Sequence, residues 1–209
     1  MSEVRSGFRH LLAMPVLYDL FQHMVGANRW RRRVIEERVL PALAIGAAVI
    51  DIGCGTGEVL NYLPNTLCYM GFDRNPQYIA DARRRFVGRN ASFHCEELTP
   101  SYRGVDSSAD CVLALGLLHH LDNESANALF KTARAALRPG GFLLTLDPLY
   151  MEGQSSLARY IISRDRGTEV RNEKAYVELA QTCFSSVDVL VDRSPLRIPY
   201  TGIVLKCRP

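Results

Sequence analysis

The most constraining feature of the sequence is the run 49–58, which reads Val-Ile-Asp-Ile-Gly-Cys-Gly-Thr-Gly-Glu. Its apolar start is typical of a buried strand. The three alternating glycines Gly53, Gly55 and Gly57 predict a tight turn with bare backbone, because a residue without Cβ lets a ligand approach closely. A helix directly after the turn would point its unpaired N–H groups and positive dipole end at that ligand. The run therefore predicts a strand, a ligand-binding turn and a helix.

The glycine spacing and the acid in front of it narrow the class of ligand. Dinucleotide enzymes use the spacing G-x-G-x-x-G to bring a pyrophosphate against a helix N-terminus. Here the spacing is G-x-G-x-G, and Asp51 lies two residues before the first glycine. A carboxylate repels a phosphate but suits a ligand that carries an amino group. The pattern therefore disfavours a nicotinamide dehydrogenase.

Apolar and amphipathic segments alternate along the rest of the chain. After the first strand, at 49–52, strands are expected over 67–72, 91–95, 110–115 and 142–146, and helices over 58–63, 76–86 and 123–137. Near the C-terminus a helix is expected over 172–182 and strands over 187–191 and 200–207, which a short connection should pair antiparallel. This alternation predicts an α/β fold, a doubly wound sheet of five parallel strands plus a C-terminal antiparallel hairpin, with helices on both faces.

Size and composition are those of one globular unit. The 209 residues fit a single domain, 1–209, and a hydrophobic content of 47% is enough for a large core. The formal charge of +3 is too small to indicate nucleic acid, and no apolar run approaches the roughly 18 residues of a membrane span. The six cysteines form no C-x-x-C pair, so we expect buried reduced thiols, no metal site and a cytoplasmic protein.

The run 49–58 closely resembles the first motif of class I S-adenosylmethionine (SAM)-dependent methyltransferases. Acids after the second and third strands, and Arg-Pro-Gly-Gly at 138–141, extend the resemblance to roughly residues 45–147. The resemblance is to small bacterial enzymes that act on small molecules. It implies a Rossmann-like methyltransferase fold, SAM as cofactor, S-adenosylhomocysteine as product and no metal. It also implies that residues 1–40 form a helical lid and that 148–172 are an acceptor-side insertion.

Cofactor-binding residues are expected at the carboxyl ends of successive strands, where ligands bind in an open parallel sheet. Asp51 suits the amino group of the methionine moiety, or else neighbouring loop amides. Asp73 follows the first glycine by 20 residues, the separation at which an acid meets a ribose diol; its alternative role is to cap the next helix. The resemblance assigns Glu97, or Glu96, to the adenine amino group and Gly116 to the methionine portion. The full set is Asp51, Gly53, Cys54, Gly55, Gly57, Asp73, Arg74, Glu97, Leu98 and Gly116.

Two adjacent histidines after the fourth strand are the candidates for proton transfer. His119 and His120 should lie beside the transferred methyl group. An imidazole titrates near pH 6.5, about where it can take a proton from a hydroxyl, carboxyl or ammonium group. Such a base is needed only where the attacking atom of the acceptor carries a proton. The alternative for both histidines is that they shape the pocket or hydrogen-bond the loop.

Acceptor contacts are expected from side chains outside the core sheet. Four arginines lie around Gly167, and a guanidinium matches a carboxylate or phosphate on the acceptor, although two nearby acids can neutralise these arginines instead. Asp147 and Tyr150 are interpreted as pocket wall or as structure, and Tyr18 as lid or core. The expected acceptor residues are Tyr18, Asp147, Tyr150, Arg164, Arg166 and Arg171.

Together these features predict SAM-dependent methyl transfer to a small-molecule acceptor, at oxygen or at nitrogen, on a sugar or secondary metabolite. The alternatives are an RNA or protein methyltransferase and a SAM-binding partner without catalysis. Arginine triplets at 31–33 and 83–85 lie on amphipathic helices near acids, which favours solvated helix faces over an RNA surface. We therefore expect a small-molecule acceptor, no nucleic acid, no membrane, and a monomer or homodimer.

Overall fold

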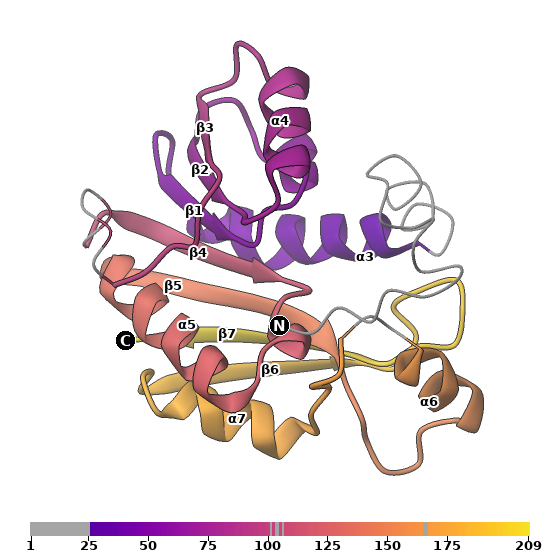
Figure 1. Ribbon diagram of the computed structural model, residues 1–209. Helices are drawn as coiled ribbons and strands as arrows, with labels where there is room; N and C mark the ends of the chain where they lie inside the picture. Colours follow the sequence, from indigo (N-terminus) through magenta and orange to yellow (C-terminus); the bar gives the residue numbers. More distant parts are fainter. Residues whose placement is uncertain (1–25, 101, 103–104, 106, 165–166) are drawn as a thin grey trace.

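The computed structural model describes residues 26–100, 102, 105, 107–164 and 167–209, which are built around a seven-stranded sheet (Figure 1). The strands are β1 (Ala48–Ile52), β2 (Cys68–Phe72), β3 (Ala91–His94), β4 (Ala109–Leu115), β5 (Leu137–Pro148), β6 (Ser186–Asp192) and β7 (Gly202–Arg208). Their order is β3-β2-β1-β4-β5-β7-β6. β1 to β5 run parallel, and β7 runs antiparallel to β5 and β6. The expected five parallel strands and terminal hairpin are confirmed.

Helices cover both faces of this sheet (Figure 1). On one face, α5 (Asn123–Ala136) and α7 (Glu173–Gln181) bury residues such as Phe130 and Tyr176 against the strands. On the other face, α3 (Ala27–Val34) and α4 (Pro76–Arg85) do the same with residues such as Trp30 and Ile79. The shorter elements are η1 (Ile35–Val39), η2 (Leu40–Ala42), η3 (Glu58–Asn61), η4 (Leu118–His120) and α6 (Ser156–Ser163).

Side-chain caps begin four of these helices, with Ser155 capping α6. The side chain of Asn75 accepts the backbone N–H groups of Gln77 and Tyr78, at 2.9 and 3.3 Å, at the start of α4. Asp122 caps α5 and Asn172 caps α7 in the same way. The alternative role of Asp73 as the cap of α4 is therefore wrong, because Asn75 occupies that position.

Three elements differ from their expected form. The helix expected over 58–63 is the single 3₁₀ turn η3, since the proline at position 64 stops continuation. β5 begins at Leu137, five residues before the expected start, because Leu137 pairs with Ala109 across a register shift. The pattern of 148–172 predicts no helix, yet α6 forms there with Ala158 and Ile162 buried one turn apart.

The N-terminal helix α3 is anchored to the terminal hairpin. Trp30 packs so closely on Gly202 that a Cβ at that glycine would lie 2.0 Å from the indole ring. Arg33 forms an ion pair with Asp192 of β6, and Arg38 of η1 pairs with Asp188 at 3.0 Å. Arginines of α3 and η1 therefore bind α3 and η1 to the hairpin.

Within the described part of the chain, none of the helices has the length and apolar character needed to cross a bilayer. All six cysteines are free thiols. Cys54, Cys111 and Cys207 are buried, as expected. Cys183 is partly exposed, and Cys68 and Cys95 are exposed, because Cys68 begins a strand and Cys95 follows one.

Candidate functional site

The glycine turn after β1 is shaped by three left-handed residues. Gly53, Gly55 and Gly57 have φ of +75°, +56° and +74°, a region that side chains other than glycine rarely adopt. A Cβ at Gly53 would lie 3.0 Å from the Leu117 side chain, and one at Gly57 would lie 2.9 Å from the Phe93 ring. A Cβ at Gly55 would meet no atom within 4 Å. The outer glycines thus fit the protein around them, and Gly55 faces open space that a ligand can occupy.

The carboxylate of Asp73 lies against this turn. It follows β2, and its Oδ2 accepts the backbone N–H of Gly55 at 3.0 Å while its Oδ1 accepts that of Asn75 at 2.8 Å. Burial raises the pKa of Asp73, and hydrogen bonds from backbone N–H groups oppose that rise. The structure thus joins two of the predicted cofactor residues, 18 positions apart in sequence, in one hydrogen bond.

Asp51 is buried beneath the turn. Its side chain accepts the hydroxyl proton of Tyr69, on β2, at 2.7 Å, and the residue is only 3% exposed. Burial raises the pKa of Asp51 to about 6, and the hydrogen bond from Tyr69 opposes this. The hydrogen bond runs to Tyr69, whereas the alternative role expected for Asp51 was a contact with neighbouring loop amides. Sequence reasoning missed Tyr69 because a strand tyrosine carries no distinguishing signal.

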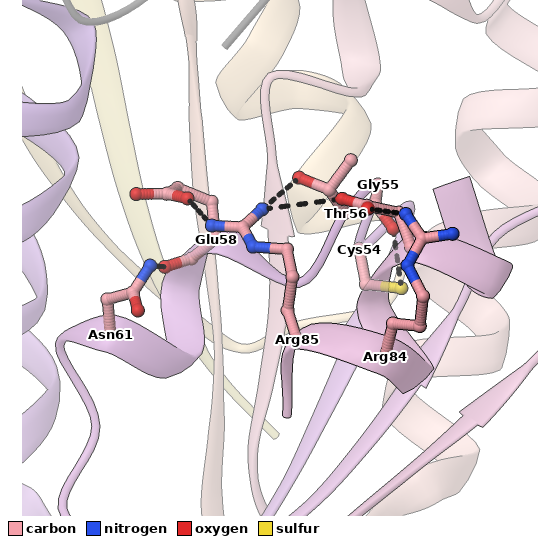
Figure 2. A network of polar contacts seen from close by, with 8 residues as sticks. Cys54, Gly55, Thr56, Glu58, Asn61, Arg84 and Arg85 are labelled. Carbon is pink, nitrogen blue, oxygen red and sulfur yellow. Dashed lines mark hydrogen bonds and ion pairs between the residues drawn. The ribbon is translucent and has the colours of Figure 1, made fainter. Parts of the chain in front are cut away.

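Arg85 of α4 contacts Thr56 and Glu58, in and directly after the glycine turn (Figure 2). One guanidinium nitrogen donates to the Thr56 hydroxyl at 3.1 Å, and another pairs with the Glu58 carboxylate at 2.8 Å. Arg85 belongs to a triplet expected on a solvated helix face near acids; it is exposed and pairs with an acid there. Its contact with the turn was not predicted. The sequence signal that could have found it is its position at the end of the helix after β2, next to the turn in a doubly wound fold.

The remaining cofactor candidates lie around the same strand ends. Arg74 and Glu97 form an ion pair at 3.5 Å in which both side chains are about two-thirds exposed. Leu98 is buried in the core, so it offers a ligand its backbone and one apolar edge. The Cys54 side chain points into the protein, because a Cβ at Gly71 would lie 2.8 Å from its sulfur. Only the backbone of Cys54 can therefore contact a ligand.

His119 and Asp147 form a buried pair at the ends of β4 and β5. Nδ1 of His119 lies 2.8 Å from Oδ1 of Asp147, and the same oxygen accepts the backbone N–H of His119 at 3.2 Å. The two side chains are 6% and 1% exposed. Burial raises the pKa of Asp147, and the hydrogen bonds from His119 oppose this. An ionised Asp147 accepts a hydrogen bond from Nδ1–H and so favours the tautomer in which Nε2 is the basic nitrogen.

The ring of His119 also borders a predicted cofactor residue. Gly116 has φ of +72°, and a Cβ built on it would lie 3.9 Å from Cε1 of His119. The Cε1 edge of the imidazole therefore faces the space beside the Gly116 backbone. The His120 ring packs on that of His119, with centroids 4.1 Å apart. His120 thus contacts His119, and His119 is the one held by a carboxylate.

Gly167 and Glu169 contact His119. A Cβ at Gly167 would lie 2.1 Å from Cδ2 of His119, so the backbone of 167 rests directly on the ring. The N–H of Glu169 donates to the carbonyl of His119 at 3.0 Å. Gly167, expected only as a break, is required here by a close approach to the candidate base.

Arg171 does not have the role expected of it. Its guanidinium donates to Asn123 Oδ1 and to the backbone carbonyls of Leu118, Leu121 and Glu169, at 2.6 to 3.1 Å. These contacts use its five N–H donors, and the residue is 9% exposed. Arg171 fixes the turn that carries His119, so it is not an acceptor clamp.

The other acceptor candidates are engaged at the surface or lie outside the described residues. Arg159 stacks on the Tyr150 ring at 4.9 Å, and Arg164 stacks on the Tyr160 ring at 5.1 Å. Tyr18 and Arg166 are among the residues that the structure does not describe. Of the four arginines around Gly167, the three that the structure describes therefore contact different parts of the protein.

The residues at these strand ends fit SAM. The open space at Gly55, with an acidic acceptor beside it, is a cradle that a Cβ would fill. Asp73 suits a ribose diol, and the Gly116 backbone lies between the turn and His119. Among the described residues, no group of three or more His, Cys, Asp or Glu side chains could hold a metal ion.

Comparisons with known proteins agree with this geometry. A family of methyltransferase domains matches residues 49–141. The chain is 31% identical over 138 residues to 2-ketoarginine methyltransferase from Streptomyces arginensis, covering 61% of this chain and 41% of that protein. It is 27% identical over 168 residues to tRNA U34 carboxymethyltransferase from Pseudomonas putida, covering 74% of this chain and 48% of that protein. The chain thus spans less than half the length of both relatives.

A similar fold is found in phosphoethanolamine N-methyltransferase 2 from Haemonchus contortus, solved with phosphomonomethylethanolamine and S-adenosylhomocysteine. The TM-score is 0.73 at 16% identity, and the match covers 98% of this chain and 61% of that one. Residues 49–141 thus match a methyltransferase domain, and the chain has the Rossmann-like fold of the methyltransferases.

Proposed function

We propose that this protein transfers the methyl group of SAM to an oxygen or nitrogen atom of a small-molecule acceptor, such as a sugar or secondary metabolite. When bound, SAM supplies a methyl group on a sulfonium centre that is already activated for displacement. The observation that carries the proposal is the set of contacts joining Asp73 to Gly55 and His119 to the space at Gly116. These contacts place a carboxylate at the end of β2 and a base at the end of β4, the two strands that flank β1.

In this proposal the turn and its neighbours bind the cofactor. The backbone at Gly55 receives it, Asp73 accepts from the ribose hydroxyls, and the backbone of Gly116 contacts its methionine portion. Glu97, paired with Arg74 at the outer end of the site, accepts from the adenine amino group. The hydrogen bond between Asp51 and Tyr69 keeps β1 and β2 in register below the ligand.

His119 is the proposed general base, and Asp147 positions it. Asp147 accepts the Nδ1 proton and so keeps the Nε2 lone pair toward the acceptor, where it can take the proton of a hydroxyl or ammonium group. The negative charge of Asp147 then stabilises the imidazolium that results. The backbone of Gly167 covers the ring on its Cδ2 side. His120 supports the ring by packing against it.

A small acceptor is favoured over RNA by the pairing of the basic side chains. On the two helices that carry arginine triplets, Arg32 pairs with Glu36, Arg33 with Asp192, and Arg85 with Glu58. Arginines neutralised in this way contribute little to phosphate binding. One relative is named for a tRNA substrate, so RNA is the second candidate acceptor. We propose a cytoplasmic enzyme that acts as a monomer or homodimer.

The test begins with calorimetric titration of SAM and S-adenosylhomocysteine, followed by transfer of labelled methyl groups to fractionated metabolites, glycans, RNA and protein. Gly55→Val should abolish cofactor binding, because its side chain would enter the open space at the turn. Gly88→Val is the matched control, since Gly88 has φ of +82° with no atom within 4 Å of a Cβ and lies outside the site. Label only in RNA, or equal loss of binding in both variants, would refute the proposal.

A further inference from the structure

A cavity of about 430 Å³ lies beyond the carboxyl ends of β5 and β6. Two segments line it: 151–158, which follows β5, and 193–201, which connects β6 to β7. They are tied together where the N–H of Leu149 donates to the carbonyl of Thr201 at 3.0 Å. Small-molecule sites range from about 300 to 1,000 Å³. The cavity therefore has the size of a site for a small ligand.

The strand order puts this cavity at the same edge of the sheet as the candidate base. β1 and β2 end at the proposed cofactor residues, β4 ends at the turn of His119, and β5 and β7 come next in the sheet. Because β7 is antiparallel to β5, the 193–201 connection lies at the same edge as those turns. Figure 1 shows it near α6, at the end of the sheet to which β5 points. The cavity thus lies at the same edge of the sheet as the candidate site, on the side away from β2 and β3.

Two arginines give the cavity a positive charge. Arg193 and Arg197 line it, and their guanidinium groups have no hydrogen-bond or ion-pair partner among the described residues. The adjacent carboxylate, Asp192, is paired with Arg33. This distinguishes the two from Arg171, whose donors are all used within the protein. Two uncompensated guanidinium groups on one cavity favour an anion with planar or tetrahedral oxygens.

The other walls define the rest of the ligand. Met151, Leu196 and Ile198 supply apolar surface. Gln154 also lines the cavity; its Nε2 donates to the carbonyl of Leu149, and its buried Oε1 has no partner within the described residues. Buried polar atoms are nearly always hydrogen-bonded, so this oxygen calls for a donor. A ligand with an apolar body, a hydroxyl or amino group and one anionic group meets all three conditions.

We propose that this cavity binds the anionic end, a carboxylate or a phosphate, of the methyl acceptor, with Arg193 and Arg197 as its anchors. That the bound anion belongs to the methyl acceptor rests on the proposed function. That the cavity binds an anion rests on the cavity alone. The proposal assigns acceptor recognition to the connection between β6 and β7, whereas the sequence pattern had indicated the arginines around Gly167.

The test is calorimetric titration of the full chain with three probes of similar size: phenyl phosphate, phenylacetate and neutral 2-phenylethanol. Both anions, or one of them, should bind at least tenfold more tightly than the alcohol, and the better anion identifies the group. Arg193→Gln and Arg197→Gln should each weaken anion binding by about tenfold, the effect of losing one charge-assisted hydrogen bond. Arg134→Gln, on the exposed face of α5, removes the same charge outside the cavity and should change nothing.

Equal affinity for the three probes, or equal affinities in the cavity variants and Arg134→Gln, would overturn the inference. SAM is titrated separately into each variant and should bind as in the parent protein. Loss of SAM binding on replacing Arg193 or Arg197 would also overturn it, since those arginines would then serve the cofactor. A parent protein that binds the anions but no SAM would refute the proposed function while leaving the anion site standing.

Discussion

Replacing Asp147 with asparagine tests the proposed base most directly. The carboxylate is 1% exposed and accepts both Nδ1–H and the backbone N–H of His119, at 2.8 and 3.2 Å. Asparagine keeps the size but removes the charge, and it can offer an N–H to Nδ1 where the carboxylate accepts one. A hydrogen bond to a charged group contributes about 1.5–3 kcal/mol. Since about 1.4 kcal/mol is a factor of ten, kcat should fall about 10- to 100-fold.

Two measurements separate positioning from a merely structural effect. Steady-state kinetics should show the fall in kcat with little change in the KM for SAM, because Asp147 lies away from the glycine turn. Nitrogen-15 NMR of the His119 ring should show the proton on Nδ1 in the parent protein and on Nε2 in Asp147→Asn.

Asp110→Asn is the matched control. Asp110 is also buried, accepts the backbone N–H of Ala48 at 2.9 Å and pairs with Arg138 at the opposite edge of the sheet. This variant should lose stability and keep kcat. An unchanged tautomer in Asp147→Asn, or the same fall in kcat in both variants, would refute the role assigned to Asp147.

Three further outcomes are expected. Asp73→Ala should weaken SAM binding by at least tenfold by calorimetry, because the turn N–H of Gly55 and the ribose would lose a charged acceptor. Asp51→Asn should alter the pH dependence of unfolding. Burial raises the pKa of Asp51 from 3.8 to about 6, so this group lowers the stability of the parent protein as pH rises from 4 through 6. The variant should lack this loss of stability. The difference, about 3 kcal/mol between pH 4 and 8, is measurable by urea denaturation. Arg171→Met should lower the free energy of unfolding by about 2–4 kcal/mol in the same assay, because the carbonyls of Leu118 and Leu121 would be left buried without donors.

The fold followed from local pattern. Apolar runs separated by helical segments specify a parallel sheet, and a short connection between the last two strands specifies an antiparallel pair. The element boundaries were less determined. β5 starts early through its pairing with Ala109, a contact that has no local signature.

The sequence by itself determined the cofactor half of the candidate site. The turn after β1 needs glycine at positions 53, 55 and 57, because the backbone there has positive φ. The acid after β2 contacts this turn, because parallel strands end at one edge of the sheet. These are local constraints repeated at a fixed spacing, so they can be read along the chain.

Only the tertiary structure decided the acceptor half. The pairing of His119 with Asp147, 28 residues apart, depends on β4 and β5 being neighbours in the sheet. An arginine in a sequence looks the same whether its donors are used within the fold, as for Arg171, or face a cavity, as for Arg193. Which of the two occurs depends on how distant segments pack, and that packing is a property of the whole fold.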